Sequence, residues 1–281
     1  MTADAGFTLG PAILFVPADR PDRFGKAADR ADAVILDLED AVAVDDKAAG
    51  RSAVMEHELD PARTIVRVNP AGTAEFADDV AAVVTTAYRT VMLAKTESAA
   101  QVDALARAVA DVRIIALCET AAGVVRASEI AAHPSVVALM WGAEDLVASL
   151  GGSSSRHSDG RYRAVAQYAR SAVLLAAGAE GVATIDAVHL DIEDLDALAA
   201  EAEDASAIGF SATACIHPGQ VATVRAAYRP HPAQLVAARE LLAAADDRPG
   251  AFRHDGRMID EPLLRQARAL VARADAAVDT P

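Results

Sequence analysis

The sequence predicts one closed (β/α)8 barrel followed by a C-terminal helical extension. Eight apolar, strand-like runs alternate with alanine-rich helical patterns along most of the 281 residues, and this alternation is typical of a parallel barrel. A chain of this length can form one such barrel or two ordinary domains. The turn after the first strand, Val16–Pro21, lacks a glycine-rich phosphate loop, and no GxGxxG or GxxxxGKS/T motif occurs. These observations favour the barrel over an open, doubly wound sheet.

The predicted elements follow one another in strict alternation. The strands lie near residues 12–17, 33–39, 63–69, 90–95, 113–119, 136–142, 182–187 and 211–217. The helices lie near 21–30, 46–59, 74–87, 98–111, 122–132, 161–178 and 193–207. Within 98–111 the apolar residues recur at the spacing of an amphipathic helix. Residues that commonly cap helix N-termini precede three of these helices, namely Asp45, Thr73 and Ser98.

The pattern changes after the eighth strand. Helical segments near 219–229 and 232–245 lead to a turn-rich break at 246–250, and a last helix runs to about residue 277. Between them, Asp255 and Gly256 indicate a tight turn or a short hairpin. We expect the barrel to span residues 10–230 and the extension residues 231–281. Because the extension is too short to form its own core, we expect it to pack on the barrel or on a neighbouring subunit.

Composition and charge exclude several classes of protein. Hydrophobic residues make up 53% of the chain and charged residues 24%, so a large core is available and disorder is not expected. The formal net charge of −15 makes non-specific binding to nucleic acid or to anionic lipid unfavourable. The two cysteines, Cys118 and Cys215, lie in apolar strands and are expected to be core residues. Without a secretory signal or a long apolar segment, the sequence predicts a cytoplasmic protein.

Three of the predicted strands end in acidic side chains. They are the runs 33–40, 113–119 and 136–145, and the carboxyl ends of parallel barrel strands are where barrel enzymes place their chemistry. Glu119 and Asp145 would follow neighbouring strands, and two carboxylates there can hold one Mg²⁺ together with water and substrate oxygens. A helix N-cap or a surface ion pair would explain either residue singly. Three such endings in one chain indicate a site for a hard cation.

Two basic residues accompany these acids. Arg67 interrupts the apolar strand 65–69, so its planar guanidinium is either paired with Asp37 and Glu39 or available for the carboxylate of a ligand. Lys95 ends the fourth strand, where it could form a Schiff base or pair with the nearby acids. The acidic surroundings favour the ion pair, which keeps the pKa of the lysine high and makes it a poor nucleophile.

Further polar residues follow the first and the last strands of the barrel. Arg20, Arg23 and Lys26 form a basic cluster after the first strand, which is either the solvated start of a helix or a rim that binds phosphate groups. His217 ends the eighth strand, and a histidine in that position is more often structural than catalytic.

Seven motifs in this order resemble those of the citrate lyase β-subunit-like proteins, which belong to the HpcH/HpaI aldolase and citrate lyase superfamily. The resemblance runs from about residue 10 to residue 275. The segments that carry it are Leu14–Arg20, Ile35–Val42, Arg67–Asn69, Lys95–Glu97, Glu119–Ala121, Gly142–Leu146 and Cys215–Pro218. The motifs are specific for the family, and they say much less about which substrate is used.

The resemblance implies a (β/α)8 barrel that uses Mg²⁺ and makes or breaks a carbon–carbon bond of an acyl thioester. By position, Glu119 and Asp145 match the metal ligands of the family. Arg67 matches the arginine that holds the carboxylate of a 2-oxo acid, as both a catalytic and a substrate-binding residue. We also place Glu39 and Lys95 among the substrate-binding residues.

The resemblance also implies how coenzyme A and a partner subunit take part. Phe15, Arg20 and Lys26 match positions that meet coenzyme A in the malyl-CoA and citramalyl-CoA lyases. Asp260 matches a C-terminal catalytic acid that related lyases insert into the site of a neighbouring subunit, and those relatives are commonly trimeric or hexameric. We therefore expect a homo-oligomer, a trimer or a hexamer.

Two residues depart from the family pattern. Ala18 follows the proline of the first strand, where glycine is usual, and Thr213 stands where many relatives have lysine. Both positions bear on how the thioester is bound, and neither belongs to the predicted metal site.

The function predicted from the sequence is a Mg²⁺-dependent carbon–carbon lyase. It would cleave a 3-hydroxyacyl-CoA of the citramalyl-, malyl- or 3-hydroxy-3-methylglutaryl type to acetyl-CoA and an oxo acid. Three alternatives remain open at this point. They are an acyl-CoA thioesterase with malate-synthase-like chemistry, a citrate lyase β subunit that acts on an acyl-carrier protein, and a non-catalytic scaffold that has kept the barrel.

Overall fold

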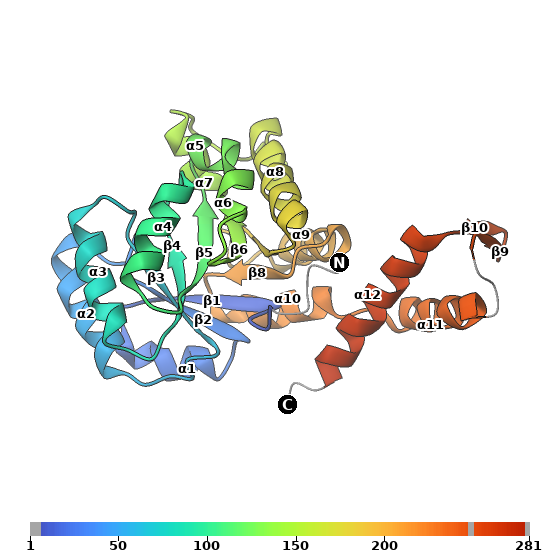
Figure 1. Ribbon diagram of the computed structural model, residues 1–281, viewed down its shortest axis with the longest axis horizontal. Coiled ribbons are helices and arrows are strands. Elements are labelled where there is room, and N and C mark those ends of the chain that lie inside the picture. The colour runs from blue at the N-terminus through green and yellow to red at the C-terminus, as the bar shows by residue number, and fades with distance from the viewer. Residues whose placement is uncertain (1–6, 247–249, 279–281) are drawn as a thin grey trace. The chain divides into compact units, whose positions relative to one another are not determined.

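The computed structural model describes residues 7–246 and 250–278 (Figure 1). The chain divides into two compact units, the first of which extends to Val224 and the second of which begins at Arg225. The division falls inside α10 (Val221–Tyr228), six residues before the expected boundary at 230. Each unit is described by itself.

The first unit is a closed barrel of eight parallel strands in sequential order, which confirms the predicted fold class. The strands are β1 (Ala12–Pro17), β2 (Ala33–Asp37), β3 (Thr64–Val68), β4 (Thr90–Leu93), β5 (Arg113–Cys118), β6 (Val136–Trp141), β7 (Ala183–Asp186) and β8 (Ala212–Cys215). The pairing of β1 with β8 closes the barrel. Most strand positions are buried, because a parallel strand covered on both faces can be continuously apolar.

Helices surround the strands in the first unit (Figure 1). They are η1 (Pro21–Arg23), α1 (Phe24–Ala28), η2 (Val44–Asp46), α2 (Lys47–Glu56), α3 (Ala74–Val84), α4 (Ala99–Ala108), α5 (Ala121–Val125), α6 (Ala127–Ala131), α7 (Ala143–Ser149), α8 (Ala164–Glu180), α9 (Leu195–Ile208) and η3 (Pro218–Gln220). The helix predicted near 122–132 is divided at Arg126, and α7 was not predicted. Within the described ranges, no helix is both long and apolar enough to cross a membrane.

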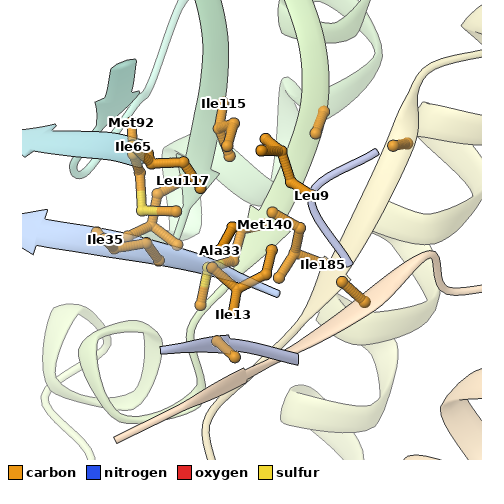
Figure 2. Close-up of a cluster of buried hydrophobic side chains, with 14 residues drawn as sticks. Leu9, Ile13, Ala33, Ile35, Ile65, Met92, Ile115, Leu117, Met140 and Ile185 are labelled. Atoms are coloured by element: carbon orange, nitrogen blue, oxygen red, sulfur yellow. The ribbon is translucent and has the colours of Figure 1, made fainter. Parts of the chain in front are cut away.

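The barrel interior is filled by apolar side chains from all eight strands. Fourteen buried residues form one cluster, among them Ile13, Ile35, Met92, Ile115 and Ile185. Figure 2 shows that branched and flexible side chains converge between the strands, so that the barrel has a packed core. Cys118 and Cys215 are fully buried in β5 and β8, as expected of core residues.

Two of the three predicted N-caps are confirmed. The hydroxyl of Thr73 accepts a hydrogen bond from the Phe76 N–H, and that of Ser98 accepts one from the Gln101 N–H. The prediction for Asp45 is wrong, because Asp45 lies inside η2 and α2 begins two residues later, after Asp46. A short 3-10 turn inserted before the helix accounts for this shift in the start.

The second unit contains two long helices and a small hairpin. α11 (Pro232–Asp246) and α12 (Glu261–Val278) are neighbours, and the antiparallel pair β9 (Phe252–His254) and β10 (Arg257–Ile259) lies between them in the chain. Asp255 and Gly256 have φ values of 46° and 77°, as a two-residue hairpin turn of this hand requires. The predicted turn is therefore confirmed.

Candidate functional site

Charged side chains gather at the carboxyl ends of five consecutive strands. Parallel pairing in register brings these ends to one rim of the barrel, as the pairing of Asp37 with Arg67 illustrates. The residues are Asp37 at the end of β2, Glu39 two positions later, Arg67 in β3, Lys95 two residues past β4, Glu119 directly after β5, and Asp145 in the first turn of α7 after β6. The structure thus brings together all the acids and cations predicted for this rim.

Arg67 is held in two-point contact by a carboxylate of the neighbouring strand. Its Nε and Nη2 donate to the two oxygens of Asp37, both at 2.6 Å, and Nη1 lies 3.1 Å from Glu39 Oε2. Burial alone would lower the pKa of Arg67, but Asp37 and Glu39 raise it above its ordinary value. The internal pairing considered from the sequence is therefore present. It leaves one N–H on each terminal nitrogen for a ligand.

Lys95 connects the ends of three strands. Its ammonium contacts Glu39, lies 2.9 Å from Asp40 Oδ2 and lies 3.4 Å from Asp145 Oδ1. The backbone of Lys95 is left-handed, with φ of 47°, a conformation that side-chain-bearing residues rarely adopt. Burial lowers the pKa of Lys95, but hydrogen bonds to Asp40 and Glu39 outweigh this and raise it. The structure supports the predicted ion pair over a Schiff-base nucleophile.

Glu119 is a buried acid that lies close to Asp145. One carboxylate oxygen accepts the backbone N–H of Lys95 at 3.1 Å, and the residue is 3% exposed. Burial, together with the negative charge of Asp145, raises the pKa of Glu119 to about 8. A buried carboxyl group that lies next to another carboxylate is poorly neutralised by the protein itself. A cation at this position would relieve the repulsion between the two groups.

Gly142 provides the space that the Glu119 carboxylate occupies. A Cβ added at Gly142 would lie 2.9 Å from both Cβ and Oε2 of Glu119, closer than real side chains approach. The φ of Gly142 is −134°, so the backbone itself would accept another residue. Close packing against Glu119 therefore explains this glycine.

The donor set of the rim fits a magnesium ion. Glu119 and Asp145 offer hard oxygen ligands, and Mg²⁺ commonly takes one or two carboxylates and completes its octahedron with water and substrate. Over the described part of the chain, no group of three or more His, Cys, Asp or Glu side chains is arranged to hold a metal. With Glu119 and Asp145 as its protein ligands, a bound Mg²⁺ would have positions left for water and substrate.

Two residues that the sequence analysis missed support the loop after β2. The Lys47 ammonium is buried and donates to the carbonyl oxygens of Leu38 and Glu39 at 2.8 and 2.9 Å. The Asn69 side chain also donates to the Leu38 carbonyl, at 2.9 Å. In the sequence, Asn69 was recognised only as the last residue of a predicted strand. Nothing in the sequence around Lys47 indicates that this lysine is buried. Both residues fix the backbone that carries Glu39.

A second buried network, also missed, stabilises the ends of β6 and β7. Asp186 accepts a hydrogen bond from Trp141 Nε1 at 2.5 Å. It also forms an ion pair with Arg170, whose Nη2 lies 2.7 Å from its Oδ2. Removing one partner of such a pair leaves a buried charge and typically costs about 3–5 kcal/mol. This network holds Trp141 directly before Gly142, and hence next to the space that Glu119 occupies.

The residues expected to meet coenzyme A lie on and after β1. The Phe15 ring packs under the Arg67 guanidinium, with 4.9 Å between Cζ and the ring centroid. Arg20 is exposed and paired with Asp22 at 3.1 Å, and Lys26 is exposed on α1. Phe15 therefore joins the charged rim, whereas the two cations are available at the surface.

The departure at Ala18 has a packing explanation. Ala18 is fully buried, and a Cβ built at Gly50 of α2 would lie 3.3 Å from the Ala18 Cβ. The extra methyl group therefore faces α2, where a glycine makes room for it. Thr213, the other departure, is buried within β8, and its N–H donates to the Pro11 carbonyl.

The two remaining candidates are His217 and Asp260. His217 caps η3, with Nδ1 accepting the Gly219 N–H at 3.1 Å, which is the structural role expected for it. Asp260 belongs to the second unit. It is exposed directly before α12, where its carbonyl accepts the Leu264 N–H at 3.1 Å.

Comparison with known proteins agrees with this arrangement. The model of the HpcH/HpaI aldolase/citrate lyase family matches residues 12–218, which include every strand of the barrel. The chain belongs to this family. It is therefore an enzyme of a carbon–carbon lyase family, and the charged rim lies where barrel enzymes of any chemistry carry their active sites.

Individual relatives narrow the comparison. The citrate lyase subunit beta-like protein of Mycobacterium tuberculosis is 56% identical over 265 residues, which cover 94% of this chain and 96% of that protein. The (3S)-malyl-CoA thioesterase of Cereibacter sphaeroides is 34% identical over 278 residues, covering 94% of each. A crystal structure of protein CitE from M. tuberculosis with magnesium, acetoacetate and coenzyme A is 55% identical. Its TM-score is 0.91, and the match covers 95% of this chain and 98% of that one.

Replacing Gly142 by alanine tests whether the space beside Glu119 matters. The new Cβ would lie 2.9 Å from Glu119 Oε2, so the carboxylate must move, and we expect the Mg²⁺ affinity to fall by about 10–100-fold, as for other substitutions next to a metal ligand. Isothermal titration calorimetry measures this affinity. Gly178→Ala is the matched control, since a Cβ there meets nothing within 4 Å. Equal affinities for both variants would contradict the expectation.

Proposed function

We propose that this protein is a Mg²⁺-dependent lyase that cleaves a 3-hydroxyacyl-CoA into acetyl-CoA and an oxo acid. The observation that carries the proposal is the pair of carboxylates, Glu119 and Asp145, at a rim that also holds the Arg67 guanidinium. A metal site next to the Arg67 guanidinium suits a substrate that carries both a hydroxyl group and a carboxylate. The metal can bind the hydroxyl group, and the arginine can bind the carboxylate. The substrate class is of the citramalyl-, malyl- or 3-hydroxy-3-methylglutaryl-CoA type, and the acetoacetate and coenzyme A in the related CitE structure support it.

In this proposal, Glu119 and Asp145 would hold the metal, which when bound would act as a Lewis acid on the substrate oxygens. Arg67 would fix the substrate carboxylate with the two N–H groups that Asp37 and Glu39 leave available. Lys95 and Glu39 would line the same rim. Cleavage removes the hydroxyl proton, breaks the bond between Cα and Cβ, and leaves the enolate of acetyl-CoA beside the oxo acid.

Asp260 would act as the general acid that protonates the enolate carbon. Its exposed position before α12 leaves the carboxyl group free to meet a substrate, and the resemblance to related lyases suggests that it does so in the site of a neighbouring subunit. In the reverse direction the carboxylate would remove the same proton from acetyl-CoA. Phe15, Arg20 and Lys26 would receive the coenzyme A portion. We place this activity in the cytoplasm.

A thioesterase is the second candidate, and the (3S)-malyl-CoA thioesterase among the relatives favours it. The same metal and the same arginine would then serve hydrolysis, which yields free CoA. A citrate lyase β subunit acting on an acyl-carrier protein is the third candidate, supported by the name of the M. tuberculosis relative. We favour a self-sufficient lyase over this third reading because Asp260 is present.

We propose further that the protein is a homo-oligomer, a trimer or a hexamer, and that copies meet through the outer face of α8. This face exposes Val165, Tyr168 and Leu175 at 43, 67 and 73%. Between residues 164 and 179 the only charged residue is Arg170, which is paired with Asp186. Since each copy has a net charge of −15, an uncharged face is where two copies can approach with the least repulsion.

Light scattering tests this interface. We expect a mass three or six times the 29.1 kDa of one chain, and Leu175→Glu should lower it, because the interface would then bury an unpaired charge. Val44→Glu is the matched control, since Val44 is equally exposed, at 75%, on η2. A monomeric wild-type protein, or a Leu175→Glu variant of unchanged mass, would disprove the interface.

Product analysis tests the activity. The purified protein is incubated with Mg²⁺ and a panel of 3-hydroxyacyl-CoA thioesters, and mass spectrometry follows the products. We expect acetyl-CoA and an oxo acid, no turnover with EDTA, and none in Glu119→Gln, which keeps the size of the side chain but removes its charge. Free CoA alone would identify the thioesterase. No turnover of any thioester would favour the carrier-protein reading or the scaffold.

Substitution of Asp260 tests the general acid. A general acid typically contributes about 10²–10⁴-fold to the rate, so Asp260→Asn should lower kcat by that factor and leave Mg²⁺ affinity unchanged. Glu261→Gln is the control, because Glu261 is the exposed neighbour and pairs only with Arg268 among the described ion pairs. A loss below about fivefold would remove Asp260 from the mechanism.

A further inference from the structure

Lys95 contacts both predicted metal ligands by different atoms. Its backbone N–H donates to Glu119 at 3.1 Å, and its ammonium lies 3.4 Å from Asp145 Oδ1. The ammonium also contacts Glu39 and Asp40. One residue thus reaches carboxylates that follow β2, β5 and β6, and its backbone is left-handed, with φ of 47°.

We propose that the Lys95 ammonium is the internal counter-cation of the metal-free site and competes with Mg²⁺ for Asp145. This inference rests on the metal site of the proposed function. In the absence of a divalent ion, the lysine would neutralise the acidic rim and keep its loops assembled. Binding of the metal would then require the lysine to give up its contact with Asp145.

The contact distances indicate which of the three ion pairs can be released. The 3.4 Å contact with Asp145 is the longest, whereas Asp40 Oδ2 lies at 2.9 Å and Glu39 is closer still. The side chains of Lys95 and Asp145 are 28 and 38% exposed, so water can replace the lost partner of each. By contrast, Glu39 is 4% exposed and could not lose its partners without leaving a buried charge. The lysine can therefore leave Asp145 while it stays on Glu39.

The charges at the rim explain why the protein needs such a counter-cation. Five carboxylates, those of Asp37, Glu39, Asp40, Glu119 and Asp145, face two cations, and Arg67 is already engaged by Asp37 and Glu39. Among the described ion pairs, Lys95 is the partner of Asp40 and Asp145. Its ammonium is attached to the rim by a strained backbone, and such strain persists only where the surroundings over-determine it.

Two opposite roles predict opposite signs for the metal affinity of a Lys95 variant. If the lysine side chain only held Glu119 and Asp145 in position, its removal would weaken Mg²⁺ binding. If it is a counter-cation, its removal leaves the acids more negative and takes away a competitor, so that Mg²⁺ binds more tightly. The backbone N–H to Glu119 is retained in any substitution except proline. The sign of the change therefore separates the two roles.

The test is calorimetric titration of Lys95→Met with Mg²⁺ at low ionic strength, in the absence of substrate. Methionine has an unbranched, apolar side chain one atom shorter than that of lysine, and it carries no charge. We expect Mg²⁺ to bind at least about threefold more tightly than to the wild type, and raising the salt concentration should reduce this difference. With EDTA, the variant should unfold at a lower temperature than the wild type, and Mg²⁺ should raise its unfolding temperature by more.

Two further variants complete the experiment. Arg107→Met removes the same charge from an exposed side chain on α4, 78% exposed and paired with Asp103, and should leave the affinity unchanged. Lys95→Arg keeps the charge and should bind Mg²⁺ like the wild type; if Lys95→Met fails to fold, Lys95→Gln replaces it. Weaker or unchanged binding in Lys95→Met, with a wild type that binds Mg²⁺ and releases acetyl-CoA, would overturn this inference alone. A wild type that binds no Mg²⁺ would also overturn the metal site of the proposed function.

Discussion

Carboxylates at the mouth of a barrel have to be paired or solvated, and here the pairing depends on the contact between Arg67 and Asp37. These residues are partners in the register of β2 and β3, so the strand pairing itself aligns the two side chains. Both hydrogen bonds measure 2.6 Å, and both residues are buried. With this carboxylate neutralised, Arg67 can also reach Glu39, and Glu39 in turn fixes the ammonium of Lys95.

The rest of the rim follows from that chain of contacts. Lys95 carries the pairing from the end of β2 to the first turn of α7, and its N–H orients Glu119. Packing completes the arrangement, because Gly142 leaves the space that the Glu119 carboxylate fills. Glu119 and Asp145 lie close enough for the charge of Asp145 to raise the pKa of Glu119. They are the two carboxylates that the family resemblance assigns to the metal.

Much of this arrangement could be predicted from the sequence, for identifiable reasons. The barrel follows from eight buried, continuously apolar runs, and the order of the acids along the chain fixes which strand ends carry them. The burial of Lys47, by contrast, could not be predicted, because a lysine at the start of a helix usually faces solvent. The division at Arg126 and the short helix α7 were also missed. The helices α5, α6 and α7 are all shorter than the window over which helical periodicity becomes visible.

For other residues the sequence indicated a role but not the contacts by which that role is carried out. The sequence allowed Arg67 either an internal or an external partner, and the structure shows that the internal partners leave two N–H groups available. The role of Gly142 also becomes visible only in the structure, where the Glu119 carboxylate fills the space beside this glycine. Such distinctions depend on distances of a few tenths of an ångström, which residue types and spacing do not encode.

The central claim is that Glu119 and Asp145 form a site for a divalent cation. A crystal structure of the protein with Mn²⁺, with anomalous scattering recorded near the manganese edge, tests this most directly because it locates the ion without reference to activity. The account predicts one anomalous peak within about 2.0–2.3 Å of an oxygen of each carboxylate, as expected for an octahedral oxygen site. A peak elsewhere on the rim, or no peak at saturating Mn²⁺, would contradict it.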